Sequence, residues 1–244
     1  MLDAWLDLLL GSSCSVCGAP GRVLCRTCEA ALPRRARAAW PTPTPAGLVR
    51  PSAVGEYADP LRRLVVDHKE HGRLGLARPL GRLLAVAVLD AWRAAEGLHP
   101  PGGVRVGLVP VPSHPSVVRA RNHDPLLRVA RVAAGVVRRE GLRARVLPVL
   151  RVTARPEDQA GLDRVARAAN LRGRFAVRGV ARVAGPVVLV DDVVTTGATL
   201  REAQRALEEA GVRVLGAATV AATRRRHPGP GAVDPRVPAV ATGD

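Results

Sequence analysis

Two adjacent carboxylates and three threonines lie close together in the segment VVLVDDVVTTGATL, residues 187–200. The segment begins with an apolar, mostly β-branched run, which is typical of a strand buried on both faces, and it ends in a helical pattern. Free N–H groups at the start of a helix, together with threonine hydroxyls, form a cradle for a phosphate dianion. Asp191 and Asp192 can accept hydrogen bonds from vicinal ribose hydroxyls and help to hold the hydration shell of Mg²⁺. A sugar phosphate would satisfy both parts of the segment.

The residues that follow predict the rest of a strand–loop–helix–strand unit. ATLREAQRALEEAG has apolar residues at helical spacing and ends at Gly211, and VRVLGAATVAA is typical of a further strand. Ligands of open α/β sheets bind at the carboxyl ends of the strands, where we expect residues 191–199. The predicted phosphate-binding positions are Val193, Val194, Thr195, Thr196, Gly197, Ala198 and Thr199.

Alternative phosphate-binding motifs fit this segment less well. A Walker loop requires GxxxxGK[ST] and a dinucleotide fingerprint requires GxGxxG, and the sequence contains neither pattern. A phospho-receiver or a helix-capping Asp pair would account for the acids, but neither requires TTGAT. The segment closely resembles the PRPP-binding motif of type I phosphoribosyltransferases. In that family two acidic residues contact the ribose, and the loop after them binds the 5′-phosphate.

The four cysteines of the chain form two pairs near the N-terminus, Cys14-x2-Cys17 and Cys25-x2-Cys28. Two such knuckles supply four thiolates for tetrahedral Zn²⁺. A site of four cysteines leaves no open coordination position, so we expect the ion to be structural rather than catalytic. A redox-active CxxC is the alternative, but it does not explain the presence of two pairs.

A second candidate binding element follows the predicted strand VRVGLVPVP. The strand leads into the loop SHPSVVRARNHD and then into a helix that begins near Pro125. Arg119 and Arg121 in this loop are a candidate pyrophosphate clamp, because guanidinium groups match the geometry of phosphate oxygens and keep their charge. A solvated basic loop is the alternative in a chain so rich in arginine.

Further motifs resemble those of the ComF family. Residues 155–175, RPEDQAGLDRVARAANLRGRF, carry the family's Gln, Arg, Asn and Phe before the strand that leads into the PRPP loop. In this chain they are Gln159, Arg167, Asn170 and Phe175. RARNHDP resembles the family's Arg-x-Arg-Gly-aromatic-Asn-Gln segment, although residues 122–125 depart from it. The cysteine knuckle fits the family, and Lys69 fits too, since members often have a lysine in this region. The resemblance covers nearly everything from Cys14 to about Thr223.

The resemblance implies an α/β fold of the type I phosphoribosyltransferase kind. This fold has a mainly parallel, twisted sheet flanked by helices, a small hood over the site and here an N-terminal zinc-ribbon-like module. Lys69 joins the PRPP-binding residues, and Mg²⁺ accompanies PRPP. The residues expected to act in catalysis are Asp191, Asp192, Arg119 and Arg121, and those expected in the hood are Gln159, Arg167 and Asn170.

The predicted domain organisation follows from changes in composition along the chain. PLRRLVVDHKEHG and RLGLARPLGRLLAVAVLDAWRAAEG have the pattern of two helices. The predicted units are a zinc knuckle with an N-terminal helix (1–32), a linker rich in Pro and Arg (33–52), the phosphoribosyltransferase-like domain (53–223) and a disordered tail (224–244).

The charge of the chain indicates an acidic partner. The formal net charge is +16 over 244 residues, and Lys69 is the only lysine. PRPP and pyrophosphate are acidic, and single-stranded DNA is a further possibility, although a coding bias toward arginine accounts for the charge equally well. Aromatic residues are 2% of the chain, so no base-stacking platform is visible. No apolar span is long enough to cross a membrane, and we expect a cytoplasmic protein.

The expected reaction is attack of a nitrogenous acceptor on C1 of PRPP with release of pyrophosphate. The sequence does not single out a general base among the histidines of this region, which are His68, His71, His114 and His123. Two other classes stay open: a PRPP-responsive regulator without turnover, and a DNA-processing accessory that binds single strands. Members of the ComF family are associated with competence and with the handling of incoming DNA.

Overall fold

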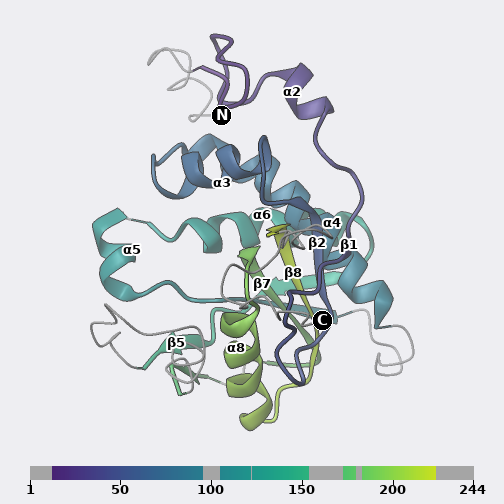
Figure 1. Cartoon of the computed structure of the whole chain (residues 1–244). Helices are drawn as coiled ribbons and strands as arrows, with labels where there is room; N and C mark the ends of the chain where they lie inside the picture. Colours follow the sequence, from purple (N-terminus) through teal and green to yellow (C-terminus); the bar gives the residue numbers. More distant parts are fainter. Residues whose placement is uncertain (1–12, 96–104, 122, 154–172, 180–182, 224–244) are drawn as a thin grey trace, which may run out of the picture.

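Parallel strands form the centre of the molecule (Figure 1). The structure is a computed structural model that describes residues 13–95, 105–121, 123–153, 173–179 and 183–223. Within these residues the main sheet has six strands in the order β1-β2-β8-β7-β3-β4, and β1 alone is antiparallel to its neighbour. The strands are β1 (Arg37–Ala38), β2 (Pro51–Glu56), β3 (Arg105–Pro110), β4 (Arg143–Val146), β7 (Val187–Val194) and β8 (Val214–Ala222).

Helices cover both faces of this sheet, which confirms the predicted fold class. Side chains of β7 alternate between two cores: Val188 and Val190 pack with α3, α4 and α6, whereas Val187 and Leu189 pack with α8. All four valine and leucine side chains of this run are fully buried, as its continuous apolar character predicts. None of the described helices is long and apolar enough to span a bilayer. The helices are α2 (Arg26–Ala30), α3 (Leu61–Lys69), η1 (Leu74–Leu76), α4 (Ala77–Ala94), α5 (Pro115–Arg121), α6 (Pro125–Arg139) and α8 (Ala198–Glu209).

The connections from β3 and β7 leave the sheet in opposite directions. β3 leads through α6 to β4, and β7 leads through α8 to β8, with α6 and α8 on opposite faces. The two strands are direct neighbours, since Pro110 pairs with Val190. Ligands of open α/β sheets bind at such a switch point, outside the carboxyl ends of the diverging strands. The fold therefore brings together the two loops that the sequence singles out.

A second, two-stranded antiparallel sheet lies beside α8. It consists of β5 (Leu150–Val152) and β6 (Phe175–Val177), and Phe175 packs in the same core as Leu200 of α8. The predicted hood residues Gln159, Arg167 and Asn170 lie outside the described residues. The same holds for the predicted N-terminal helix and for the predicted tail.

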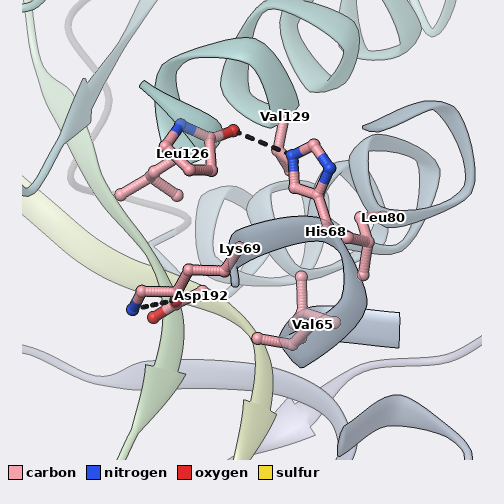
Figure 2. A pocket seen from close by; sticks show the side chains of 9 residues that line it. Val65, His68, Lys69, Leu80, Leu126, Val129 and Asp192 are labelled. Atoms are coloured by element: carbon pink, nitrogen blue, oxygen red, sulfur yellow. Dashed lines mark hydrogen bonds and ion pairs between the residues drawn. The ribbon is translucent and has the colours of Figure 1, made fainter. Parts of the chain in front are cut away.

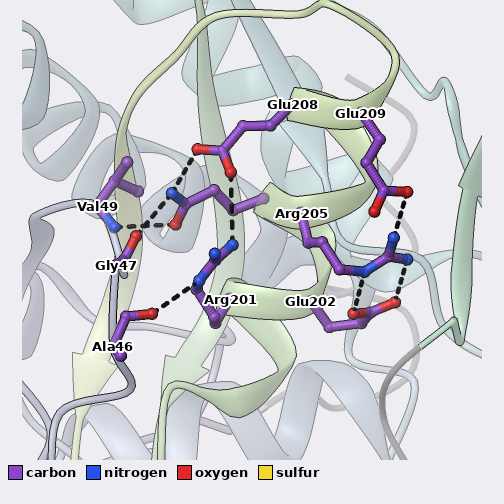
Figure 3. Close-up of polar contacts among 9 residues, drawn as sticks. Ala46, Gly47, Val49, Arg201, Glu202, Arg205, Glu208 and Glu209 are labelled. Carbon is purple, nitrogen blue, oxygen red and sulfur yellow. Dashed lines mark hydrogen bonds and ion pairs between the residues drawn. The ribbon is translucent and has the colours of Figure 1, made fainter.

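Residues 33–52, which the sequence predicts to be a linker, take part in the main domain. They form β1 and the start of β2, and the stretch between them lies along α8 (Figure 3). Gln204 of α8 accepts a hydrogen bond from the Val49 N–H at 2.9 Å and donates one to the Gly47 carbonyl at 2.9 Å. Between the two strands, side chains of α8 rather than a regular ladder satisfy backbone groups of residues 46–49.

Candidate functional site

The acidic pair lies within β7 and not in the loop after it. The sequence predicts that the strand stops at Val190, but backbone pairing with β8 continues as far as Val194 opposite Ala222. The pairing extends because β8 is itself nine residues long and offers partners beyond the apolar run. The loop is thus short and comprises residues 195–197 only. Asp191 and Asp192 therefore stand on a rigid element.

The two carboxylates are held by hydrogen bonds from the strand itself. The Asp192 N–H donates to Asp191 Oδ1 at 2.8 Å, and the Val193 N–H donates to Asp192 Oδ1 at 2.9 Å. The second oxygen of Asp192 accepts from Lys69 Nζ at 2.7 Å, and Lys69 comes from the end of α3 (Figure 2). The sequence assigned Lys69 to the site through the family resemblance alone, and the structure places its ammonium against the acidic pair.

The crowding of these charges changes how the groups titrate. Burial and the neighbouring carboxylate of Asp192 raise the pKa of Asp191 well above its usual value. Burial alone would lower the pKa of Lys69, but the carboxylates of Asp192 and Asp191 outweigh it, so that pKa lies above its usual value. Two carboxylates share one ammonium here, and carboxylate oxygens are ligands that Mg²⁺ prefers. The donor set therefore fits a hydrated magnesium ion.

The short loop after β7 turns directly into α8 and consists of residues that the sequence predicts to hold a phosphate. Thr195 and Thr196 are exposed, and Gly197 adopts a left-handed conformation, with φ of +74°, directly before α8. The Ala198 N–H faces Thr196 Oγ1 at 3.4 Å, and Thr199 is half-buried in the first turn of α8. Val194 differs from the others, because its side chain is buried in the core and its carbonyl accepts from the Thr223 N–H at 2.9 Å.

Gly197 also packs closely against the segment that precedes β2. A Cβ at this position would lie 2.9 Å from Pro41 Cγ, 3.0 Å from Leu48 Cδ2 and 3.4 Å from Pro45 Cδ. Both the left-handed backbone and this close approach require glycine here. The segment thus supports the loop from behind, which the sequence does not reveal.

Polar residues of α8 fix the elements on both sides of it (Figure 3). Arg201 donates to the Ala46 carbonyl at 2.9 Å on one side. On the other side Glu202, which is buried, pairs with Arg205 at 2.7 Å and faces the Phe175 N–H at 3.5 Å. Sequence reasoning missed these residues and Gln204. A charged or amide side chain on the apolar face of a helix is the signal that could have found them.

The predicted loop between β3 and α6 contains a helix, α5, that ends at Arg121. The sequence prediction overlooked it, although Pro115 is well suited to a first helical position and His114 Nδ1 accepts from the Ser116 N–H at 3.3 Å. Arg119 is exposed. Arg121 is half-buried and donates from Nη2 to Glu70 Oε2 at 2.5 Å. α5 thus carries both predicted phosphate-binding arginines in its last turn.

His68 holds the end of α3 in place. It is buried, and its Nδ1 and Nε2 lie 3.3 Å from the carbonyl oxygens of Arg73 and Pro125. Figure 2 shows the second of these contacts. Burial lowers the pKa of His68 below its usual value. The cavity between α3, α6 and Asp192 has a volume of about 20 Å³, which is room for a water molecule and not for a base. The contacts of His68 therefore join the end of α3 to the start of α6.

The four cysteines come together as the sequence predicts. Their sulfur atoms all lie within 4.8 Å of one another, with Cys14 buried and Cys17 exposed. Backbone N–H groups of Cys17, Cys25 and Val16 outweigh the effect of burial and lower the pKa of Cys14 to about 6. Four thiolates at this spacing fit a structural zinc ion with a closed coordination shell.

Arg73 connects the cysteine knuckle to the end of α3. Its guanidinium donates to Ser15 Oγ at 2.7 Å and to the Ser13 carbonyl, and it pairs with Asp67 at 3.2 Å. The knuckle therefore sits directly above α3, as Figure 1 shows. The helix that bears Lys69 is supported by the knuckle on one side and by α6 on the other.

Comparison with known proteins identifies the family of the chain. Residues 183–237, which include all of β7, α8 and β8, match the family described as phosphoribosyl transferase domain. The chain is also 30% identical over 169 residues to competence protein F of Haemophilus influenzae, a match that covers 66% of this chain and 68% of that protein. The chain belongs to the competence protein F family.

Proposed function

We propose that this protein binds PRPP with Mg²⁺ and transfers its phosphoribosyl group to a nitrogenous acceptor, releasing pyrophosphate. The observation that carries the proposal is the arrangement at the switch point of the sheet. The acids of β7 and the anion cradle before α8 lie beside the end of β3, and the segment that follows β3 carries Arg119 and Arg121. PRPP has complementary groups in the same order, which are its 5′-phosphate, its ribose hydroxyls and its pyrophosphate.

Each group of the ligand has a partner in this assignment. Asp191 and Asp192 accept hydrogen bonds from the ribose hydroxyls, and the backbone and hydroxyl groups of residues 193–199 hold the 5′-phosphate. Arg119 and Arg121 hold the pyrophosphate, because their guanidinium groups stay charged and pair with phosphate oxygens in two places at once. Magnesium, when bound, supplies positive charge that offsets the charge of the pyrophosphate.

The transfer step uses these contacts for positioning and charge stabilisation. The acceptor nitrogen forms a bond to C1 while the bond from C1 to the pyrophosphate oxygen breaks, and the electron pair leaves with the pyrophosphate. Positive charge builds on the ribose ring, and in this proposal the carboxylates of Asp191 and Asp192 stabilise it. Holding both ends of PRPP across the reacting carbon contributes further to the rate.

Binding of PRPP is the first measurement that tests the proposal. Calorimetric titration of the full chain should show binding that depends on Mg²⁺ and is lost when Asp191→Asn and Asp192→Asn are combined. Hydrogen bonds to charged groups contribute about 1.5–3 kcal/mol each, so losing those to the ribose takes the affinity below detection. Glu29→Gln with Glu209→Gln is the matched control, because it removes two carboxylates from the knuckle and from the far end of α8. Unchanged affinity in the Asn variant would refute the placement of the ribose.

Turnover is a separate question from binding. Release of pyrophosphate that depends on an added nucleobase would establish a transferase, whereas tight binding of PRPP without release would assign the protein to the regulatory class. The name of the relative, competence protein F, suggests a link to DNA uptake. Fluorescence anisotropy with labelled single-stranded DNA tests that link, and affinity that falls steeply with salt would indicate contacts to phosphates.

A further inference from the structure

Two consecutive residues at the end of α3 contact both halves of the proposed PRPP site. Lys69 Nζ lies 2.7 Å from Asp192 Oδ2, where the ribose and its magnesium are proposed to bind. Glu70 Oε2 lies 2.5 Å from Arg121 Nη2, where the pyrophosphate is proposed to bind. The ammonium of Lys69 thus pairs with the carboxylate of Asp192, and the carboxylate of Glu70 pairs with the guanidinium of Arg121.

Glu70 is placed where a carboxylate is otherwise unfavourable. It is the C-terminal cap of α3, and the partial negative charge at a helix C-terminus repels an anion. The Glu70 side chain is 48% exposed, whereas that of Arg121 is 20% exposed. The contact with Arg121 is therefore what holds the Glu70 carboxylate near the protein surface, and the side chain is free to turn toward solvent when that contact breaks.

The backbone that carries Lys69 and Glu70 is fixed independently of both contacts. The neighbouring residue His68 is buried and contacts the carbonyl oxygens of Arg73 and Pro125. Arg73 in turn is bound to Ser15 of the knuckle. Exchange of partners at Arg121 therefore requires only a side-chain rotation of Glu70 and no movement of α3.

We propose that Glu70 is an internal competitor of pyrophosphate: its carboxylate occupies Arg121 in the empty site, and the diphosphate end of the ligand must displace it. This inference rests on the proposed function, because it takes Arg121 as a pyrophosphate ligand. The contact lowers the affinity for free pyrophosphate, and it returns when pyrophosphate leaves. Glu70 is thus a residue that sets the strength of product binding.

The test is a titration of the full chain with Mg²⁺ and inorganic pyrophosphate, comparing wild type with Glu70→Gln. A half-exposed ion pair is worth up to about 1 kcal/mol, so the variant should bind pyrophosphate about two- to fivefold more tightly. Glu29→Gln is the control, since Glu29 forms a pair of the same length, 2.5 Å, with Arg82 on the knuckle side of the protein. The control changes the net charge equally and should leave the affinity unchanged.

A second variant ties the effect to Arg121. In an Arg121→Gln background, Glu70→Gln should produce no gain, because the group that it releases is missing. The role of Glu70 would be overturned if Glu70→Gln bound pyrophosphate no more tightly than wild type, or if Glu29→Gln showed an equal gain in affinity. In either case, binding of pyrophosphate by the wild type would leave the proposed function intact. A gain that persists without Arg121 would likewise overturn the role of Glu70. If no protein in the series binds pyrophosphate or PRPP, the proposed function itself fails, and this inference fails with it.

Discussion

Gly81 of α4 packs closely against α6, and its replacement by alanine tests this packing. A Cβ at Gly81 would lie 2.5 Å from both Cβ and Cγ1 of Val132, and 3.0 Å from the carbonyl oxygen of Val129. Because the Cβ of Val132 is fixed by the helix backbone, no change of rotamer relieves the first contact. The two helices would have to move apart, and this disturbs the core that they share.

The size of the effect follows from two opposing contributions. Alanine is favoured over glycine inside a helix by about 1 kcal/mol, whereas overpacking a core costs about 1–3 kcal/mol. The contacts of 2.5 Å place Gly81 at the upper end of that range, so Gly81→Ala should lower the free energy of unfolding by about 2 kcal/mol. In a domain of this size that corresponds to a fall in Tm of about 4–8 °C.

Gly135 of α6 provides the matched control. A Cβ there would meet only Arg138 Nη2, at 3.8 Å, which is an ordinary contact. Gly135→Ala should therefore gain the helix preference alone and raise Tm by about 2–4 °C. Thermal unfolding followed by circular dichroism compares the two variants with wild type. A Tm for Gly81→Ala at or above that of wild type would refute the tight packing of α4 on α6.

Three further predictions concern the site and the elements that support it. Asp191→Asn should raise Tm at neutral pH, because burial raises the pKa of Asp191 and makes its ionised form costly in the folded protein. Stability associated with a raised carboxyl pKa is lost as pH rises through that pKa. The difference in Tm between Asp191→Asn and wild type should therefore grow with pH in a series of melts. A difference in Tm that does not change with pH would contradict this reasoning. Cys14→Ser should reduce the zinc content measured by elemental analysis, with zinc retained at wild-type level as the contrary result. Gln204→Leu should lower the free energy of unfolding in urea by about 1–3 kcal/mol, because it leaves the Val49 N–H and the Gly47 carbonyl without their partner, and an unchanged midpoint would argue against these bonds.

Local features of the site could be predicted from the sequence with some accuracy. The apolar run before Asp191 forms a buried strand, Gly197 makes the left-handed turn, and the residues after it form a helix. The two CxxC pairs come together in one cluster. In each case the chemistry depends on residues close in sequence, so spacing alone carries the information.

The end of β7 and the structure of residues 33–52 could not be predicted, because they depend on contacts with distant parts of the chain. The strand β7 continues through Asp192 to Val194 because β8 supplies hydrogen-bonding partners there, which an apolar pattern cannot indicate. Residues 33–52 lack periodicity, yet they form β1 and the start of β2, and side chains of α8 bond the backbone of residues 46–49 between them. Hydrogen-bond partners from distant parts of the chain thus determine both the length of β7 and the conformation of residues 33–52.

The sequence by itself determined the side chains available to this protein: an acidic pair, a Thr-Thr-Gly turn before a helix, two arginines after β3 and four thiols. Only the tertiary structure decided which of these groups meet. Lys69, rather than one of the many arginines, lies against Asp192, and Glu70 occupies Arg121. These pairs join residues far apart in the chain, and they depend on the order of strands and on the packing of α3, which no local pattern specifies.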